Sequence, residues 1–460
     1  GSAKDPSVGG LVLARELVDE LDVSTVATNR AACDALLEGL SDGNRDVRGL
    51  LLSVLAGGNS LAQMQQAISF IVQQGGAHFS LSQERGLPTL AWPEDVRRKG
   101  VEVAAETAAR TKDREERITA VRVLAIGRTP EAERELVRRV SEDDAAIQRI
   151  ALMGLANASP EAIPDLLVVA SVAEGEVRNA LIGIGEASLQ RLPWAWKPER
   201  RTISAEAKKV ILEGLAKQGA PERLLCVGAA GLFGVGDSRA TLEEILCGTG
   251  EAPLRRRAAV ALGRLGDPAC LARLQGLLRS ETDGVVREGV ALGLARFRRP
   301  EALTVLVEAL RRRDYASAVN LRAAIREIVG DDVRPLSDLA AKERADTAWI
   351  GLASVIARVP GEASVKALAE LSSAERKRSP YRHLRAEALL FEIGDVSRLA
   401  SVLEALADEA DEMRSEAHRV LVRWFHVDCG SEAGRWKDWW EQNRARHQFD
   451  PETESFQRVK

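Results

Sequence analysis

A unit of about 30 residues, written almost twice between positions 255 and 310, constrains the fold of this 460-residue chain more than any other feature. Ala261–Gly263 (Ala-Leu-Gly) recurs as Ala291–Gly293, 30 residues further on (263 to 293). A proline follows each copy, at Pro268 and at Pro300, and a second apolar run follows each proline. A period of this size, made of two helix-length segments, is typical of α-solenoids.

The spacing of apolar residues indicates that each half of the unit is a helix. Asp267 suits the N-cap and Pro268 the first helical position, and leucines then recur in one stripe at Leu271, Leu274, Leu277 and Leu278. No stretch of the chain shows the strict alternation of a half-buried strand. A helix of about a dozen residues is roughly 18 Å long, and a pair this short cannot bury its apolar face alone. We therefore expect an all-α fold, an α-solenoid of stacked antiparallel helix pairs.

Two short elements of the unit match a known family. The first is an acidic turn followed by Val-Arg, at Asp283–Arg287 (Asp-Gly-Val-Val-Arg) and at Glu174–Arg178 (Glu-Gly-Glu-Val-Arg). The second is Leu-Gly-Arg-Leu-Gly-Asp-Pro at Leu262–Pro268. With these elements the unit resembles a HEAT repeat, of the shorter bacterial kind also found in phycobilisome lyases. The resemblance implies a superhelix of HEAT-like repeats of about 30 residues, and it implies little about function, because HEAT arrays serve many processes.

Breaks in the helical pattern divide the chain into six expected segments: an N-terminal helical region with degenerate repeats (1–74), a loop or small hairpin (75–93), HEAT-like repeats (94–187), an insertion loop rich in Trp, Pro and Arg (188–204), further HEAT-like repeats (205–430), and a Trp-rich C-terminal cap and tail (431–460). In the last segment, Trp436–Asn443 resembles the short Trp-x-x-Trp-Trp helix that follows the last repeat in some bacterial HEAT proteins. We expect its tryptophans to cover the last open apolar face. We expect the polar residues after about Arg446 to be disordered.

Composition argues against several classes of protein. A net charge of −4 is nearly neutral for this length, so the chain as a whole is not drawn to nucleic acid or membranes. The five cysteines are scattered without a Cys-x-x-Cys pair, which predicts reduced core thiols. No run of 18 apolar residues is present, so no membrane span is expected. A cytoplasmic location is the default expectation, and the Gly-Ser start, which resembles a cloning scar, leaves open a signal peptide that has been removed.

Acidic residues precede arginines by four positions at the starts of three expected helices, in the pairs Glu174 and Arg178, Glu251 and Arg255, and Asp283 and Arg287. We expect each acid to cap the amides at the helix start. Each arginine is expected to bind an acid of the next repeat, because stacking aligns equivalent positions. The pairs would then form a ladder along one edge of the solenoid, and we favour this structural role over a functional one.

Clusters of arginines in successive repeats are a candidate binding site: Arg255, Arg256, Arg257, Arg298, Arg299, Arg311 and Arg312. If equivalent positions lie side by side, these residues form a basic ridge that suits phosphate groups or an acidic protein. The competing interpretation is a solvated face on which glutamates alternate with the arginines, at Glu281, Glu288, Glu301 and Glu308. We favour the solvated face, because the chain is not basic overall.

The insertion loop 188–204 holds the strongest single candidate, Trp194 and Trp196, which basic residues follow at Arg200 and Arg201. Exposed Trp and Arg dominate the binding energy of protein interfaces, so this loop is a candidate recognition element. Alternatively, both rings fold back and fill a gap between mismatched repeats. The sequence favours neither interpretation.

No catalytic or metal-binding pattern is found. The chain has no Ser-His-Asp arrangement, no Gly-rich phosphate loop and no His-Glu-x-x-His motif. His418 and His426 would lie about 12 Å apart on one helix, too far to chelate one ion without a third element. We therefore expect no catalytic residue, no cofactor and no metal.

These patterns predict a non-enzymatic scaffold or adaptor that binds another protein on its concave surface and its inserted loops. The first alternative is a nucleic-acid-binding protein of the HEAT-like DNA glycosylase type. This resemblance is one of fold alone, and it predicts a steep fall of affinity with salt. The second alternative is a lyase for a bilin chromophore, as among HEAT-like phycobilisome lyases, which predicts a pigment pocket. The oligomeric state stays open.

Overall fold

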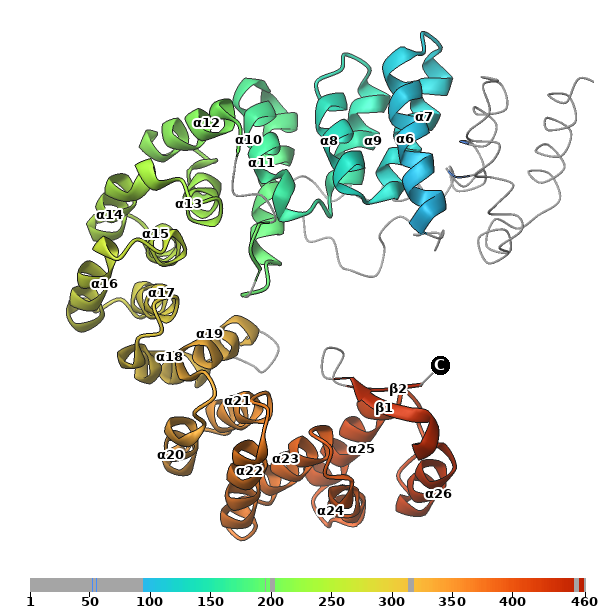
Figure 1. Ribbon diagram of the computed structural model, residues 1–460, viewed down its shortest axis with the longest axis vertical. Coiled ribbons are helices and arrows are strands. Elements are labelled where there is room, and N and C mark those ends of the chain that lie inside the picture. Colours follow the sequence, from blue (N-terminus) through green and yellow to red (C-terminus); the bar gives the residue numbers. More distant parts are fainter. Residues whose placement is uncertain are drawn as a thin grey trace, which may run out of the picture. The chain divides into compact units, whose positions relative to one another are not determined.

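The structure is a computed structural model that describes residues 94–194, 196–198, 203–312, 318–450 and 455–458, together with Leu52 and Leu55 (Figure 1). Apart from those two leucines, the expected N-terminal region 1–74 and the expected loop 75–93 lie outside the described residues. The chain forms two compact units, Gly1–Leu192 with Lys197–Thr241, and Pro193–Trp196 with Leu242–Lys460.

The described part of the first unit is a series of short helices. They are α6 (Glu94–Arg110), α7 (Arg114–Gly127), α8 (Pro130–Arg139), α9 (Ala145–Leu155), α10 (Ile163–Val172), α11 (Gly175–Gln190), α12 (Ala205–Ala216) and α13 (Arg223–Leu232), with the 3-10 turns η2 (Pro160–Ala162) and η3 (Gly236–Ser238). Helix α14 (Arg239–Cys247) contains the boundary between the units.

The second unit continues the same pattern. Its helices are α15 (Ala252–Leu265), α16 (Ala269–Ser280), α17 (Gly284–Ala295), α18 (Leu303–Leu310), α19 (Val319–Val329), α20 (Arg334–Lys342), α21 (Asp346–Ala357), α22 (Glu362–Glu375), α23 (Pro380–Glu392), α24 (Leu399–Glu404), α25 (Asp411–Phe425) and α26 (Ala433–Asn443). Four 3-10 turns, η4 (Pro300–Ala302), η5 (Val396–Arg398), η6 (Ala405–Ala407) and η7 (Arg444–Arg446), separate or follow them.

Alternate helices pack on one another and form two layers in each unit. In the second unit, α15, α17, α19, α21, α23 and α25 pack in series, and α20 packs on α22 in the other layer (Figure 1). In the first unit, α7, α9, α11 and α13 form one series, and α6, α8, α10 and α12 form the other. This arrangement confirms the predicted all-α solenoid of stacked helix pairs.

The chain after Arg446 is not disordered throughout, as the sequence had led us to expect. Strands β1 (His447–Asp450) and β2 (Ser455–Arg458) pair antiparallel, with His447 opposite Arg458. The His447 ring lies 5.4 Å from the Trp439 ring, and β2 contacts α25. The polar composition of the tail conceals this pairing, because its order depends on contacts with earlier helices rather than on local propensity.

Close approach of two helices explains the recurrent Ala-Leu-Gly element. A Cβ atom added at Gly263 of α15 would lie 2.5 Å from the Cα atom of Gly293 in α17. One added at Gly293 would lie 2.6 Å from the carbonyl oxygen of Ala259, and one at Gly289 2.6 Å from that of Arg256. Real Cβ atoms do not approach so closely, so α15 and α17 pack backbone to backbone and require glycine at these positions.

A cap on the preceding helix explains the arginine of the Val-Arg element. Arg287 Nε donates to the carbonyl oxygen of Leu278 at 3.4 Å, at the end of α16. Arg255 Nε donates likewise to Leu246 at 3.0 Å, and Arg223 Nε to Leu215 at 3.0 Å. The last carbonyls of a helix have no partner within it, so each arginine satisfies one of them and complements the helix dipole.

The acid of the same element has the predicted role at one position of three. Asp283 accepts hydrogen bonds from the amides of Val285 (2.8 Å) and Val286 (3.1 Å). Glu174 and Glu251 occupy the N-cap position without a side-chain cap bond, so the prediction is wrong there. The shorter Asp side chain places its oxygen at the first amides, whereas the longer Glu side chain is not a favoured N-cap.

The Trp-rich helix α26 packs into the core of the second unit. Trp436 and Trp440 of α26 are buried in a cluster with Phe391 and Phe425. The Trp440 ring centroid lies 5.3 Å from that of Phe425 and 5.6 Å from that of Phe391. The Nε1 group of Trp436 donates to the carbonyl oxygen of Gly430 at 2.6 Å, so burial leaves this donor satisfied.

The cysteines fit the predicted core role in part. Cys226 and Cys270 are buried, whereas Cys247 is exposed and Cys429 is half-buried. Burial, and then the charge of Glu222, raises the pKa of the Cys226 thiol to about 12, so it stays protonated at neutral pH.

Candidate functional site

Three of the seven clustered arginines bind carboxylates within the fold. The pairs are Arg255 with Glu281, Arg256 with Glu288 (Nη2 to Oε1, 2.8 Å), and Arg311 with Glu343 (Nη2 to Oε2, 2.9 Å). The three glutamate side chains are only 8%, 6% and 3% exposed. The partners stand 26 to 32 residues apart in the chain, and of the three arginines only Arg255 belongs to the predicted acid-to-arginine pairs. These positive charges are therefore largely neutralised inside the solenoid.

The other four clustered arginines differ in exposure. Arg298 and Arg312 are exposed, and Arg257 and Arg299 are half-buried. Neither Arg298 nor Arg312 forms an ion pair with a described carboxylate, whereas Arg311, which is also exposed, binds Glu343.

The seven arginines do not lie on one ridge. Arg255 stands at the start of α15 and Arg311 directly after α18. Both therefore lie at the edge of the solenoid where an even-numbered helix ends and the next odd-numbered helix begins. Arg298 and Arg299 follow α17, at its other end. The 12 residues of α17 span about 18 Å, so the two groups lie on opposite edges rather than along one ridge, which was the less favoured of the two interpretations. That these residues bind a partner stays a prediction.

Trp194 is packed into the second unit rather than exposed. Its side chain is 6% exposed, and the guanidinium carbon of Arg296 lies 3.9 Å from the ring centroid. The indole Nε1 group donates to Glu327, and Arg296 donates to the backbone carbonyl of Trp194 and to Glu327 (3.2 Å). The Trp194 ring is therefore buried and bonded within the second unit, and a recognition role for it stays a prediction.

The rest of the loop is described only in part. Trp196 is half-buried, and its amide donates to the carbonyl oxygen of Pro193 at 3.1 Å. Arg200 and Arg201 lie outside the described residues. A recognition role for Trp196, Arg200 and Arg201 therefore stays a prediction.

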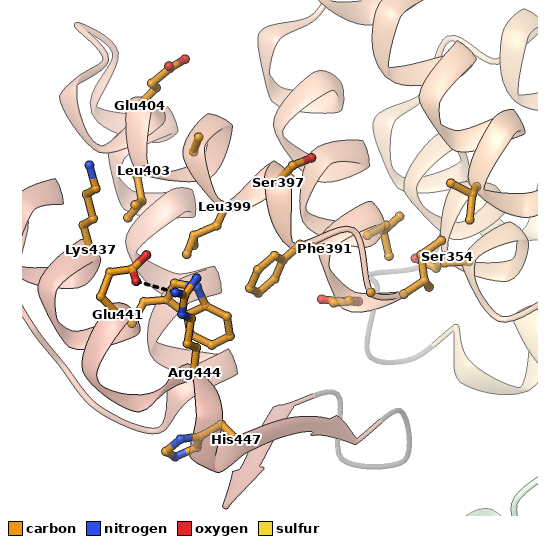
Figure 2. A pocket seen from close by; sticks show the side chains of 18 of the residues that line it. Ser354, Phe391, Ser397, Leu399, Leu403, Glu404, Lys437, Glu441, Arg444 and His447 are labelled. Atoms are coloured by element: carbon orange, nitrogen blue, oxygen red, sulfur yellow. Dashed lines mark ion pairs between the residues drawn. The ribbon is translucent and has the colours of Figure 1, made fainter.

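A groove at the C-terminal end of the second unit is a candidate site that the sequence did not indicate. It encloses 1790 Å³ and is lined by the end of α21, the start of α22, the end of α23, α24 and α26. We call it the C-terminal groove. Figure 2 shows Leu399 and Leu403 on one side of it, Ser354 across from them, and Phe391 between.

The accessible surface of the C-terminal groove is made of small apolar side chains. Pro360, Ala400 and Ala407 are exposed, and so is Val365, at 38%. Larger apolar lining residues are buried beneath them, namely Leu389, Phe391, Leu399, Leu403 and Trp440. The exposed walls are therefore apolar, and the buried residues below them hold them in place.

Charges of both signs surround the C-terminal groove. The acidic members are Glu362, Glu392, Glu404 and Glu441, and the basic members are Arg358, Lys437 and Arg444. Arg444 binds Glu441 at 3.2 Å (Figure 2). Three positive and four negative side chains leave the groove without a strongly dominant sign.

Two glycine turns shape the mouth of the C-terminal groove. Gly361 precedes α22 with φ of 116°, and Gly394 follows α23 with φ of 105°. Residues with a Cβ rarely adopt such φ values, so these turns favour glycine. Nothing local in the sequence showed that α26 would pack beside these turns.

One cluster in the second unit has the residue types of a nucleophile and base. Ser372 Oγ lies 2.8 Å from His383 Nδ1 and also bonds Glu387. Ser372 is 2% exposed and Glu387 is buried, so substrate has no access to the hydroxyl. The cluster joins α22 to α23 as a satisfied polar network.

Metal-ligating side chains do not gather in groups of three anywhere in the described part of the chain. His418 Nε2 lies 2.8 Å from Asp428 Oδ1, which is a single hydrogen-bonded pair rather than a chelate. The bond from His418 lowers the pKa of the Asp428 carboxyl. Of the helices described, none combines the length and the apolar character that crossing a membrane needs.

A family profile described as HEAT repeats matches residues 209–295 and 239–328. No curated protein sequence matches the chain. Among solved structures, an engineered protein is 17% identical over 85% of this chain and 98% of its own, with a TM-score of 0.28. Importin beta in a polyethylene glycol condition is 14% identical over 96% of this chain and 70% of its own, with a TM-score of 0.36. A chain of the Kap95:Nup1 complex is 13% identical over 96% and 66%, with a TM-score of 0.39.

The matched segments cover α13 to α18, where the Ala-Leu-Gly and Val-Arg elements stand. The same helix pairing and the same arginine-to-acid spacing continue on both sides of them, at Arg114 with Asp144 and at Arg385 with Glu416. Residues 209–328 therefore match HEAT repeats, and the helix pairs on both sides of them are built in the same way.

Proposed function

We propose that this chain is a non-enzymatic scaffold that binds another protein, and that a polypeptide segment of that protein occupies the C-terminal groove. The size of the groove carries the proposal. Its 1790 Å³ exceeds the range of about 300–1000 Å³ that small-molecule sites occupy. A HEAT-repeat solenoid is also an architecture typical of binding scaffolds, because stacked repeats provide an extended surface.

The walls of the C-terminal groove suit a polypeptide. Alanines at 400 and 407 leave room for the side chains of a partner, and Pro360 and Val365 offer apolar contact. Charges of both signs on the rim can pair with a mixed polypeptide surface. They do not suit a phosphate backbone, which needs a dominant positive charge.

Nucleic acid is the second candidate, and the exposed Arg298 and Arg312 favour it. The same two residues are equally suited to contact an acidic protein surface, since arginine binds carboxylate and phosphate alike. Arg255, Arg256 and Arg311 contribute less to either role, because each already binds a carboxylate of the fold. A bilin ligand gains no support, because one small pigment would not fill the groove.

The test blocks the groove without disturbing the fold. Ala400→Trp places a large side chain in the groove at an exposed helical position, and Ala341→Trp makes the same change at an exposed position of α20 outside the groove. Each variant and the parent chain are used to capture proteins from a lysate of the source organism. The captured protein is then purified, and its affinity for all three chains is measured by titration calorimetry.

A protein that binds the parent and Ala341→Trp equally, but binds Ala400→Trp at least tenfold more weakly, supports the proposal. Equal affinity for all three chains refutes the groove as the site. Nucleic acid that co-purifies with every variant and is released by raised salt refutes the protein scaffold in favour of the second candidate.

A further inference from the structure

Arg264 in the second unit, like Arg299, lacks the side-chain partners that comparable arginines have. Arg264 stands in the last turn of α15 and is half-buried. Its Nε atom is enclosed by the protein and has no hydrogen-bond partner. Among the residues that the structure describes, no carboxylate or carbonyl oxygen accepts a hydrogen bond from its guanidinium. A partly desolvated cation without an acceptor costs stability, so its presence needs an explanation.

The period of the repeats shows where the missing acid would stand. The glutamate that binds Arg256 lies 32 residues after it, and the same separation joins Arg311 to Glu343. Thirty-two residues after Arg264 stands another arginine, Arg296 (264 to 296). A positively charged residue thus stands at the position where an acid would complete an ion pair with Arg264.

Arg296 cannot supply the missing negative charge, and the acid that it binds does not bond Arg264. Glu327 Oε2 accepts from Arg296 and from the indole of Trp194. No described carboxylate therefore pairs with Arg264 in this cluster of residues. Burial, and then the charge of Arg296, lowers the pKa of Arg264 to about 10, which still leaves it charged at neutral pH.

A simpler explanation is that Arg264 only complements the dipole at the end of α15. Arg326 shows how an arginine does this in the equivalent turn of α19, because it donates to the carbonyl oxygen of Gly330 just beyond that helix. Arg264 makes no such bond in the described structure, although its half-buried position makes an acceptor more valuable. The dipole alone therefore does not account for it.

We propose that Arg264, with Arg296 beside it, binds the carboxylate of an acidic side chain on the protein that this scaffold holds. The inference rests on the proposed function for the origin of that carboxylate, and not on the C-terminal groove. One carboxylate matches the single uncompensated charge. A phosphate group carries a charge of about −1.5 to −2. It would leave an excess of negative charge at this partly desolvated site.

The test uses the full chain and a defined probe at low ionic strength. Titration calorimetry measures the binding of a blocked peptide of six glutamates, of a blocked peptide of six glutamines, and of inorganic phosphate. The variants are Arg264→Gln and, as a matched loss of one positive charge, Arg376→Gln at an exposed position after α22. Losing a charge-assisted hydrogen bond weakens binding about tenfold or more, so Arg264→Gln should lose affinity for the glutamate peptide by that factor. Arg376→Gln should retain it within about twofold.

Any of three results would overturn the proposal. These are equal affinity of the two variants for the glutamate peptide, no binding of that peptide to the parent chain, and binding of phosphate that depends on Arg264 and is tighter than binding of the peptide. Thermal melting gives a second readout, because Arg264→Gln breaks no described bond and should melt at or above the temperature of the parent. A lower melting temperature would show a structural role and also overturn it. Ala400→Trp should bind the glutamate peptide as tightly as the parent chain does, although it no longer binds the captured protein. The two experiments therefore distinguish a failure of the Arg264 proposal from a failure of the groove proposal.

Discussion

The backbone contact between α15 and α17 predicts that replacement of Gly263 by alanine destabilises the second unit. The added Cβ atom would lie 2.5 Å from both the Cα atom and the carbonyl oxygen of Gly293. Ordinary carbon contacts are about 3.5–4.0 Å, so the two helices must separate by roughly 1 Å. Both obstructing atoms belong to the backbone of a helix, and neither can rotate away.

The size of the change in the free energy of unfolding follows from two opposing effects. Overpacking of a close interface costs typically about 1–3 kcal/mol, and the upper end applies because backbone atoms obstruct the methyl group. Alanine gains up to about 1 kcal/mol over glycine inside a helix. We therefore expect Gly263→Ala to lower the free energy of unfolding by about 2 kcal/mol.

Gly276 provides a control of opposite sign. It lies in α16, is exposed, and a Cβ atom there would meet nothing within 4 Å. Gly276→Ala should raise the free energy of unfolding by about 0.5–1 kcal/mol through helix propensity alone. Urea denaturation followed by circular dichroism gives both values, and hydrogen exchange of α15 and α17 amides locates the change. If Gly263→Ala is as stable as Gly276→Ala, the backbone contact is not as close as described and the explanation of the Ala-Leu-Gly element fails.

Three further perturbations have defined outcomes. Glu416→Ala removes the carboxylate that lies 3.0 Å from the buried Arg385 guanidinium. Urea denaturation should show a free energy of unfolding lower by about 3–5 kcal/mol, and a decrease below about 1 kcal/mol would contradict the burial of the pair. Trp194→Ala removes a buried indole and its hydrogen bond and should cost about 3–5 kcal/mol, whereas a melting temperature equal to that of the parent would place the ring in solvent. Hydrogen bonds from Arg334 lower the pKa of Asp332 from 3.8 to about 2, so its contribution to stability is present above pH 4 and is lost as the pH falls towards 2. Asp332→Asn should abolish that part of the acid sensitivity of thermal melting, and an unchanged pH profile would contradict the assignment.

The solenoid could be predicted from the sequence because its determinants are local. The leucine stripe of Pro268–Ser280 and the recurrence of Ala-Leu-Gly lie within one or two repeats, and each repeat contacts only its neighbours. The arginine bonds between repeats could be predicted in kind for the same reason. The exact acid could not, because Arg255 binds Glu281 rather than Asp283, whose carboxylate caps its own helix.

The remaining features depend on contacts between segments far apart in the chain. Trp194 bonds Glu327, 133 residues away, and a single sequence has no signal for that pairing. The C-terminal groove likewise combines the turn at Gly361 with Lys437 of α26. The sequence pattern identified the Trp-rich helix, but the space beside it depends on how α26 packs on α24 and on Phe391 of α23.

The arginines show how a repeat sequence can mislead about surface charge. Read along the chain, Arg255, Arg256 and Arg311 belong to basic clusters, and their acids stand 26 to 32 residues later. The superhelix brings those acids into contact, so a cluster that is basic in sequence becomes neutral in space. The informative arginine is then the one whose partner position is not acidic. By that criterion Arg264, an isolated arginine in the sequence, is a stronger candidate for binding than the three consecutive arginines that precede it.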